Sequence, residues 1–259
     1  MRPRGFTLVE IMVVVVIVAT LASIVYVLGS RMVTRARIAQ SSSNLRTLVT
    51  ANQGYHADHR TYCPADNQSN TLRWHGRRTS AQAGFDSTRG LLSPYLGQSR
   101  KVMVCPLFEE LVPNEVSFES GTGGYGYNAA YIGGKPGSPW DRSTRLRIPE
   151  RMANILDASR TVMFTTTAYA RAGGLQEYPY CEPPFWDFGG GPSGMRPSPS
   201  VHFRANGKAI VAWCDGHVTL EASNREEQHG ANPHGGDSHD HDLGWFGSEE
   251  NNGAWNPQK

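Results

Sequence analysis

The most uneven feature of the chain is an apolar run near its amino terminus. Between Glu10 and Arg31 lie twenty uncharged residues, IMVVVVIVATLASIVYVLGS. A helix rises about 1.5 Å per residue, so this run would span about 30 Å, the thickness of a bilayer core. Its first half is rich in β-branched residues, which form helices poorly in water. In lipid, however, the backbone must satisfy its own hydrogen bonds. The pattern predicts a membrane-spanning helix.

The same helix is expected to continue beyond the membrane. No proline occurs between Phe6 and Tyr62, and the predicted helix ends at about Ala57. In its later part, one set of residues recurs at spacings of seven, three and four, which places them on one helical face. The set is Ile38, Leu45, Leu48, Val49, Asn52 and Tyr55. This amphipathic half is predicted to pack on a sheet.

Short apolar segments further along the chain predict strands. They are Lys101–Cys105, Thr161–Thr167, Lys208–Cys214 and His217–Leu220. The last two flank Asp215-Gly216, a strong signal for a two-residue hairpin turn. Long stretches rich in Gly, Pro and aromatic residues separate the strands. The predicted fold class is therefore α+β, a lollipop in which a long amino-terminal helix packs on a small antiparallel sheet with long loops.

Composition and charge exclude several classes of protein. The 259 residues include 28 Gly and 16 Pro, which favours loops. The net charge of +2 is too small to indicate a nucleic-acid-binding protein. Collagen, coiled coil, polytopic membrane protein and a wholly disordered chain are also excluded. The glycines from Gly121 to Gly126 do not open a helix after a strand, so they do not form a nucleotide-binding loop.

The histidines give the strongest hint of an enzyme. His229, His234, His239 and His241 lie in a Gly-rich stretch and could bind a divalent cation. However, no His-Glu-x-x-His or Gly-x-Ser-x-Gly motif occurs. A non-enzymatic protein is therefore predicted, with a metal-dependent enzyme as a weaker alternative.

The residues around the start of the apolar run resemble a known processing site. Gly5-Phe6-Thr7-Leu8-Val9-Glu10 follows a short basic leader and is similar to the sites of type IV pilins and type II secretion pseudopilins. The resemblance implies that prepilin peptidase cuts between Gly5 and Phe6 and that Phe6 becomes N-methylated. It also implies that Glu10 pairs with the amino terminus of a neighbouring subunit. A removable secretory signal and a plain signal anchor are the alternatives.

This resemblance implies a domain organisation and a location. Residues 1–5 would be the leader, 6–30 the transmembrane and assembly helix, 31–62 its amphipathic continuation, and 63–259 an extracytoplasmic α+β domain with a loop-rich carboxyl-terminal segment. The chain would cross the inner membrane once. It could then enter a periplasmic or extracellular filament.

Further segments resemble two branches of this family. Ser43-Asn44-Leu45-Arg46-Thr47-Leu48, followed by Tyr55 and Tyr62-Cys63-Pro64, resembles the helix end of G-type pseudopilins. Asp215-Gly216-His217-Val218 resembles the last hairpin of pilin-like proteins from planctomycete-type bacteria, as do Cys105-Pro106 and Tyr125-Gly126-Tyr127-Asn128. His202 departs from that pattern, because it precedes Asp215 by thirteen positions where the family usually has ten.

The four cysteines allow up to two disulfides in an extracytoplasmic domain. Three pairings are open. Joining Cys63 to Cys105 would tie the helix end to the first predicted strand, and joining Cys181 to Cys214 would clamp a loop to the last hairpin. Four buried or free thiols are the alternative. Zinc is not favoured, because no Cys-x-x-Cys pair occurs.

No cofactor is required by this interpretation, although calcium is considered. Some G-type pseudopilins hold calcium in a carboxyl-terminal loop, and by position the corresponding candidates are Asp237, Asp240 and Asp242. Carboxylates suit this hard cation. A solvated acidic loop is the alternative.

The leading hypothesis is a structural subunit of a type II pseudopilus or a type IV pilus-like filament. The partners it implies are further copies, other pilin-like subunits, prepilin peptidase, the inner-membrane assembly machinery and membrane lipid. Nucleic acid is not among them. The main alternative is an extracytoplasmic binding domain that is tethered by an uncleaved helix and is not assembled.

Overall fold

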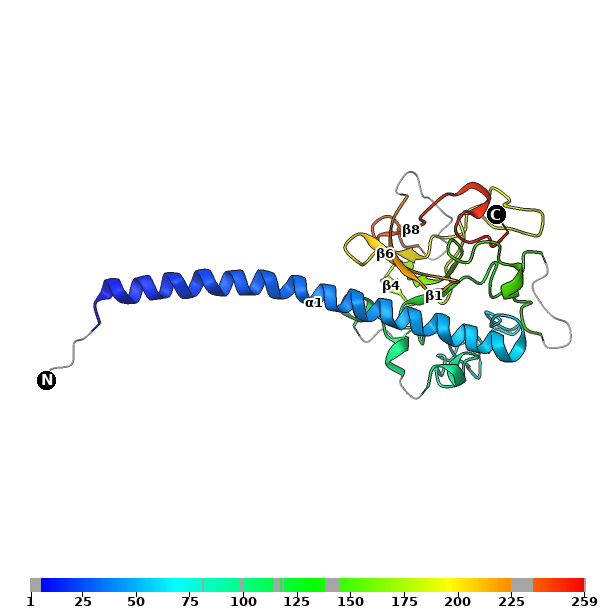
Figure 1. Ribbon diagram of the computed structural model, residues 1–259, viewed down its shortest axis with the longest axis horizontal. Coiled ribbons are helices and arrows are strands. Elements are labelled where there is room, and N and C mark those ends of the chain that lie inside the picture. The colour runs from blue at the N-terminus through cyan, green and yellow to red at the C-terminus, as the bar shows by residue number, and fades with distance from the viewer. Residues whose placement is uncertain are drawn as a thin grey trace.

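One helix dominates the computed structural model (Figure 1). Helix α1 (Leu8–His59) extends as a stalk from the globular domain and then crosses the domain with its carboxyl-terminal half. Its C-cap is Arg60, whose φ of 62° is left-handed and whose N–H donates to the His56 carbonyl at 2.7 Å. The structure describes residues 6–80, 82–97, 100–113, 117, 119–137, 145–224 and 235–258.

The domain is built on a four-stranded antiparallel sheet in the order β1-β2-β6-β7. Its strands are β1 (Tyr125–Tyr127), β2 (Val162–Thr166), β6 (Lys208–Trp213) and β7 (Val218–Ala222). The central register pairs Thr165 with Val211, and a bulge interrupts β2 between Val162 and Phe164. Strand β7 lies at the edge of the sheet and is only partly buried.

Smaller elements surround this sheet. Strands β3 (Tyr169–Arg171) and β4 (Gly174–Gln176) form a hairpin, and β5 (Val201–His202) pairs with β8 (Leu243–Gly244). The short helix α2 (Pro106–Leu111) lies beside α1. Four 3₁₀ turns complete the described elements: η1 (Ser93–Tyr95), η2 (Arg100–Met103), η3 (Met152–Asn154) and η4 (Glu250–Asn252).

The sheet separates two apolar clusters, and β6 contributes to both. Ile210 and Ala212 pack with Leu45 and Leu48 of α1, whereas Val211 packs with Trp245 on the other side. This alternation is expected of a central strand, whose successive side chains point to opposite faces. The helix therefore covers one face, and segments near the carboxyl end cover the other.

The α+β lollipop predicted from the sequence is confirmed. The predicted helix and the strands at Thr161–Thr167, Lys208–Cys214 and His217–Leu220 are observed with small shifts in their bounds. The strand predicted at Lys101–Cys105 is wrong. That segment forms η2 and then the N-cap of α2, because Pro106 fits the first turn of a helix and favours an extended residue before it.

The Asp215-Gly216 hairpin is observed, but its loop has three residues. The Gly216 N–H donates to the Trp213 carbonyl, and the Trp213 N–H donates to the His217 carbonyl, both at 3.0 Å. Gly216 has a φ of 96°, so the loop is a turn closed by a left-handed residue.

Gly216→Val should lower the free energy of unfolding by more than about 1 kcal/mol. No atom lies within 4 Å of a Cβ built there, so the cost arises from the backbone. The measurement is urea unfolding of a chain that begins at Arg31. Gly173→Val is the control, because that glycine has open space and no left-handed φ. Equal stability of the two variants would contradict the assigned turn.

Candidate functional site

The candidate processing and assembly site lies at the free end of the stalk. Phe6 is 82% exposed and precedes α1. Gly5, the residue predicted to precede the cleaved bond, lies outside the described residues. Thr7 has extended backbone dihedrals and forms the N-cap of the helix. The bond that a peptidase would have to reach therefore ends on an exposed residue that precedes the helix.

Glu10 is bound to Thr7 in a capping box. Its carboxylate accepts hydrogen bonds from the Thr7 N–H at 2.7 Å and the Thr7 hydroxyl at 2.8 Å, while the Glu10 N–H donates to that hydroxyl at 3.3 Å. Such reciprocal bonds satisfy donors that a helix start leaves unpaired. Thr7-x-x-Glu10 before an apolar run is the sequence signature of this box, and the sequence prediction did not include it.

The stalk presents its apolar side chains outward all round. From Phe6 to Val33, every large apolar side chain that the structure describes is at least 48% exposed. The most apolar window of α1 has a mean hydropathy of 3.0 and no residue buried in the fold. A surface of this kind is unstable in water, and it is long enough to cross a membrane.

Two asparagines fix the other half of α1 to the sheet. Asn44 donates to the Tyr125 hydroxyl at 3.1 Å, and Asn52 donates to the Tyr127 hydroxyl at 3.0 Å. Asn52 also accepts the Cys63 N–H at 2.8 Å. All of these groups are buried, so each hydrogen bond offsets a desolvation cost. The stalk therefore leaves the domain in one fixed direction.

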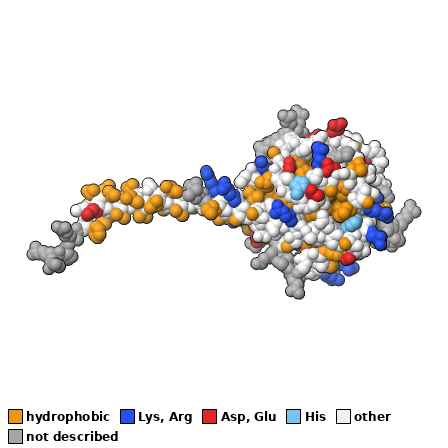
Figure 2. Space-filling view, viewed as in Figure 1, with side chains coloured by type: hydrophobic (Ala, Val, Ile, Leu, Met, Phe, Trp, Pro, Cys, Tyr) orange, Lys and Arg blue, Asp and Glu red, His pale blue; other side chains and the backbone are white. Residues whose placement is uncertain are grey.

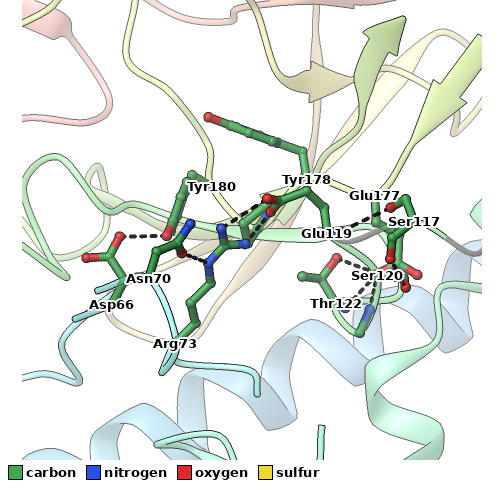
Figure 3. Close-up of polar contacts among 12 residues, drawn as sticks. Asp66, Asn70, Arg73, Ser117, Glu119, Ser120, Thr122, Glu177, Tyr178 and Tyr180 are labelled. Carbon is green, nitrogen blue, oxygen red and sulfur yellow. Dashed lines mark hydrogen bonds and ion pairs between the residues drawn. The ribbon is translucent and has the colours of Figure 1, made fainter. Parts of the chain in front are cut away.

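A buried ion pair between Arg73 and Glu119 joins two loops of the domain (Figure 3). Arg73 pairs with Glu119 through its two terminal guanidinium nitrogens, and its Nε donates to Asn70 at 2.8 Å. The guanidinium carbon lies 4.4 Å from the Phe85 ring centroid. The two paired side chains are 4% and 10% exposed. The Arg73 guanidinium and the Glu119 carboxylate are thus bound within the chain, which fits a structural role.

A second carboxylate is enclosed by backbone N–H groups. Glu177 Oε2 accepts from the N–H groups of Gly121, Thr122 and Gly123 at 2.6–2.8 Å and from the Thr122 hydroxyl at 3.0 Å (Figure 3). The glycine-rich stretch thus binds a side chain of its own chain. This geometry agrees with the sequence argument against a nucleotide-binding loop.

Two buried histidines are uncharged. The pKa of His75 is well below its usual range, because burial and the nearby Arg73 and Arg78 disfavour a further positive charge. Burial, together with Arg204 and His241, likewise lowers the pKa of His202. Because unfolded histidine has a pKa of about 6.5, the unfolded state binds more protons below that pH.

The free energy of unfolding should therefore decrease as the pH falls below about 6.5, by up to about 1.4 kcal/mol per pH unit for each histidine. Burial raises the pKa of Glu182, which acts in the opposite sense and offsets part of the loss. The measurement is urea unfolding at pH 7.5 and 5.5. His75→Phe should reduce the difference, and an equal or higher stability of the parent at pH 5.5 would contradict the assignment.

The four cysteines are buried free thiols, so neither predicted bridge is formed. Cys105 Sγ lies 3.4 Å from Ser41 Oγ, whereas the Cys63 N–H binds Asn52, eleven residues further along α1. That separation is about 16 Å along the helix axis, and a disulfide needs Cα atoms within about 7 Å. The pairing of Cys63 with Cys105 is therefore wrong.

The pairing of Cys181 with Cys214 is also wrong, because the two residues belong to apolar clusters on opposite sides of the sheet. Cys214 packs in the cluster on the α1 side, and Cys181 packs in the cluster on the opposite side. Burial raises the pKa of the Cys63 and Cys181 thiols well above the usual range, which keeps them protonated and unreactive.

The three aspartates considered for calcium are not brought into one site. Asp237 accepts the His239 N–H at 2.8 Å, and Asp242 has a left-handed φ of 50°. Within the described ranges, no three His, Cys, Asp or Glu side chains gather in a group that could hold a metal ion. His229 and His234, considered for an enzymatic site, lie outside those ranges.

The Asp-Gly-His-Val string forms a local contact at the hairpin. Asp215 accepts both the N–H of His217, at 3.0 Å, and its Nδ1 nitrogen, at 2.6 Å. The His217 ring stacks on Trp213 with an interplanar angle of 12°. These contacts order the turn, which gives the motif a structural explanation.

Comparison with known families identifies the amino-terminal segment. A model of the prokaryotic N-terminal methylation motif, the signature of pilins and pseudopilins, matches residues 1–26. No curated protein and no solved structure matches the chain. The motif supports a type IV pilin-like or pseudopilin precursor, and a structural subunit rather than an enzyme.

Proposed function

We propose that the chain is the precursor of a filament subunit. Prepilin peptidase cleaves it between Gly5 and Phe6 and methylates Phe6. The mature chain then assembles with further copies or other pilin-like subunits into a type II secretion pseudopilus or a type IV pilus-like filament. Before assembly it is anchored in the inner membrane by residues 6–30, with the domain on the extracytoplasmic side.

The observation that supports the proposal is that the methylation motif coincides with the exposed apolar stalk. The methylation motif falls on the free end of a stalk whose apolar side chains are exposed in the isolated chain. Lipid can cover such a stalk before assembly, and the stalks of neighbouring subunits can cover it afterwards. A tethered binding domain would also need the span, but it would have no use for a processing motif at its tip.

Glu10 is proposed to act at assembly. In the isolated chain its carboxylate is bound by Thr7 of the same helix. After cleavage, the new amino group of a neighbouring subunit supplies a positive partner, because a carboxylate at the edge of an apolar span is costly unless paired. Glu10 then sets the axial position of the incoming subunit.

The intact mass of the membrane-extracted protein tests the proposed processing. The expected species lacks residues 1–5 and carries one extra methyl group. Gly5→Val should accumulate as the full precursor, because a peptidase site fitted to glycine has no room for a branched side chain. Gly29→Val is the control, because Gly29 lies within α1 and no atom lies within 4 Å of a Cβ built there. A parent chain that retains Met1, or normal maturation of Gly5→Val, would overturn the proposal.

A further inference from the structure

The junction between stalk and domain carries exposed apolar side chains beside basic ones. Met32 is 69% exposed, and Arg31 and Arg35 are also exposed. Both Arg31 and Met32 lie one helical turn from Arg35, so the three side chains occupy one side of α1. Figure 2 shows basic side chains on the stalk immediately before the domain. We call Arg31, Met32 and Arg35 the stalk collar.

A second surface on the same chain has the complementary character. On and beside α2, Val104 is 40% and Leu111 is 53% exposed, and Glu109 and Glu110 are exposed acidic residues. A hollow of about 310 Å³ adjoins them and is lined in part by Val104, Glu109 and Val112. We call Val104, Glu109, Glu110 and Leu111 the α2 patch.

We propose that the α2 patch of one copy receives the stalk collar of the next copy in the filament. This inference rests on the proposed function and adds a specific contact between subunits. Opposite charges and exposed apolar side chains meet across it. Glu110 already pairs with Arg37 of its own chain, so Glu109 is the carboxylate that receives the neighbour's arginine.

The axial register supports this contact. If Glu10 of one copy lies level with Phe6 of the next, the two helices are offset by four residues, or about 6 Å. The same offset brings Val33 of the second copy level with Arg37 of the first. Because Arg37 pairs with Glu110, the α2 patch lies at that level. The collar and the patch thus meet in the register that Glu10 imposes.

The shape of the contact favours a second copy as the occupant. The collar and the patch are different surfaces of one chain, so their contact is heterologous. A heterologous contact that is repeated with an axial shift does not close into a ring, and it propagates as a helical filament. Anionic lipid could also attract the collar arginines, but it would leave the acidic patch without a partner.

Cysteine crosslinking in filaments tests the contact. Cells co-express a Met32→Cys chain and a Leu111→Cys chain with different tags, so that any disulfide between the tags joins two molecules. The natural cysteines are buried and should not react. Oxidation of sheared filaments should give a heterodimer that disappears on reduction. The control pairs Met32→Cys with Leu220→Cys, whose side chain is 41% exposed on the sheet edge.

Charge exchange gives a second readout. Glu109→Arg should reduce filament yield several-fold, and adding Arg35→Glu should restore part of it. Filaments that form normally but give no heterodimer above the Leu220 control would overturn the contact and leave the proposed function standing. A parent chain that is processed but forms no filaments would overturn the proposed assembly, and the contact with it.

Discussion

Glu10→Ala should leave membrane insertion, cleavage after Gly5 and folding of the domain intact, while filament yield falls sharply. The span loses a carboxylate at its edge, which makes insertion no harder. Assembly suffers because the amino group of the neighbouring subunit enters an apolar environment without its partner. Removing one member of a buried charged pair changes an equilibrium by roughly a hundredfold or more. The measurement is sheared filament relative to total processed protein.

Glu10→Gln separates the capping role that the structure shows for this residue from its proposed role in assembly. Glutamine can replace glutamate in a capping box, so the hydrogen bond to Thr7 is retained while the charge is lost. Thr7→Ala is the converse control, since it removes the capping hydroxyl and keeps the carboxylate. We expect Glu10→Gln to assemble as poorly as Glu10→Ala, and Thr7→Ala to assemble better than either. Parental filament yield from Glu10→Gln would favour a tethered domain.

Glu119→Ala should destabilise the domain by about 3–5 kcal/mol, because it leaves the Arg73 guanidinium buried without its carboxylate. A loss of this size approaches the whole stability of many domains. The measurement is urea unfolding at pH 7.5 of a chain that begins at Arg31. This truncation keeps every residue that is buried in the described part of the chain, because the large apolar side chains described up to Val33 are all exposed.

Glu249→Ala provides a matched control for the effect of burial. Glu249 also forms a bidentate ion pair, with Arg196. However, the Glu249 side chain is 29% exposed and the Arg196 side chain 23% exposed. Solvent screens such a pair, so its loss should cost about 1 kcal/mol or less. Similar losses in the two variants would mean that burial of the Arg73–Glu119 pair is not the source of its stabilisation.

The sequence predicted the elements whose pattern is local. A twenty-residue apolar run and an amphipathic face define α1, and short apolar segments define β2 and β6. Strand β1 was not predicted, because Tyr125-Gly126-Tyr127 is short and rich in turn residues. It is held by distant partners, namely the asparagines of α1 and the pairing of Gly126 with Thr165 of β2. No local pattern contains that information.

The candidate site was predictable to a similar extent. The motif from Gly5 to Glu10 is a contiguous string, so it can be recognised without a structure. Thr7 was overlooked although its spacing from Glu10 is the known capping signature. The proposed disulfides failed for a different reason: cysteine spacing along a chain contains no distance in space, and α1 keeps Cys63 and Cys105 apart.

The residues that cover the face of the sheet opposite α1 constrain when this domain can fold. Trp245, Phe246 and Trp255 supply much of that cover, and the Asn128 side chain binds the Trp255 carbonyl at 3.0 Å. Synthesis proceeds from the amino terminus, so these residues are made after α1 and all four strands of the sheet. A nascent chain therefore has its anchoring span long before it can complete its core. A chain whose synthesis stops before these residues would leave this face of the sheet exposed and open to proteolysis.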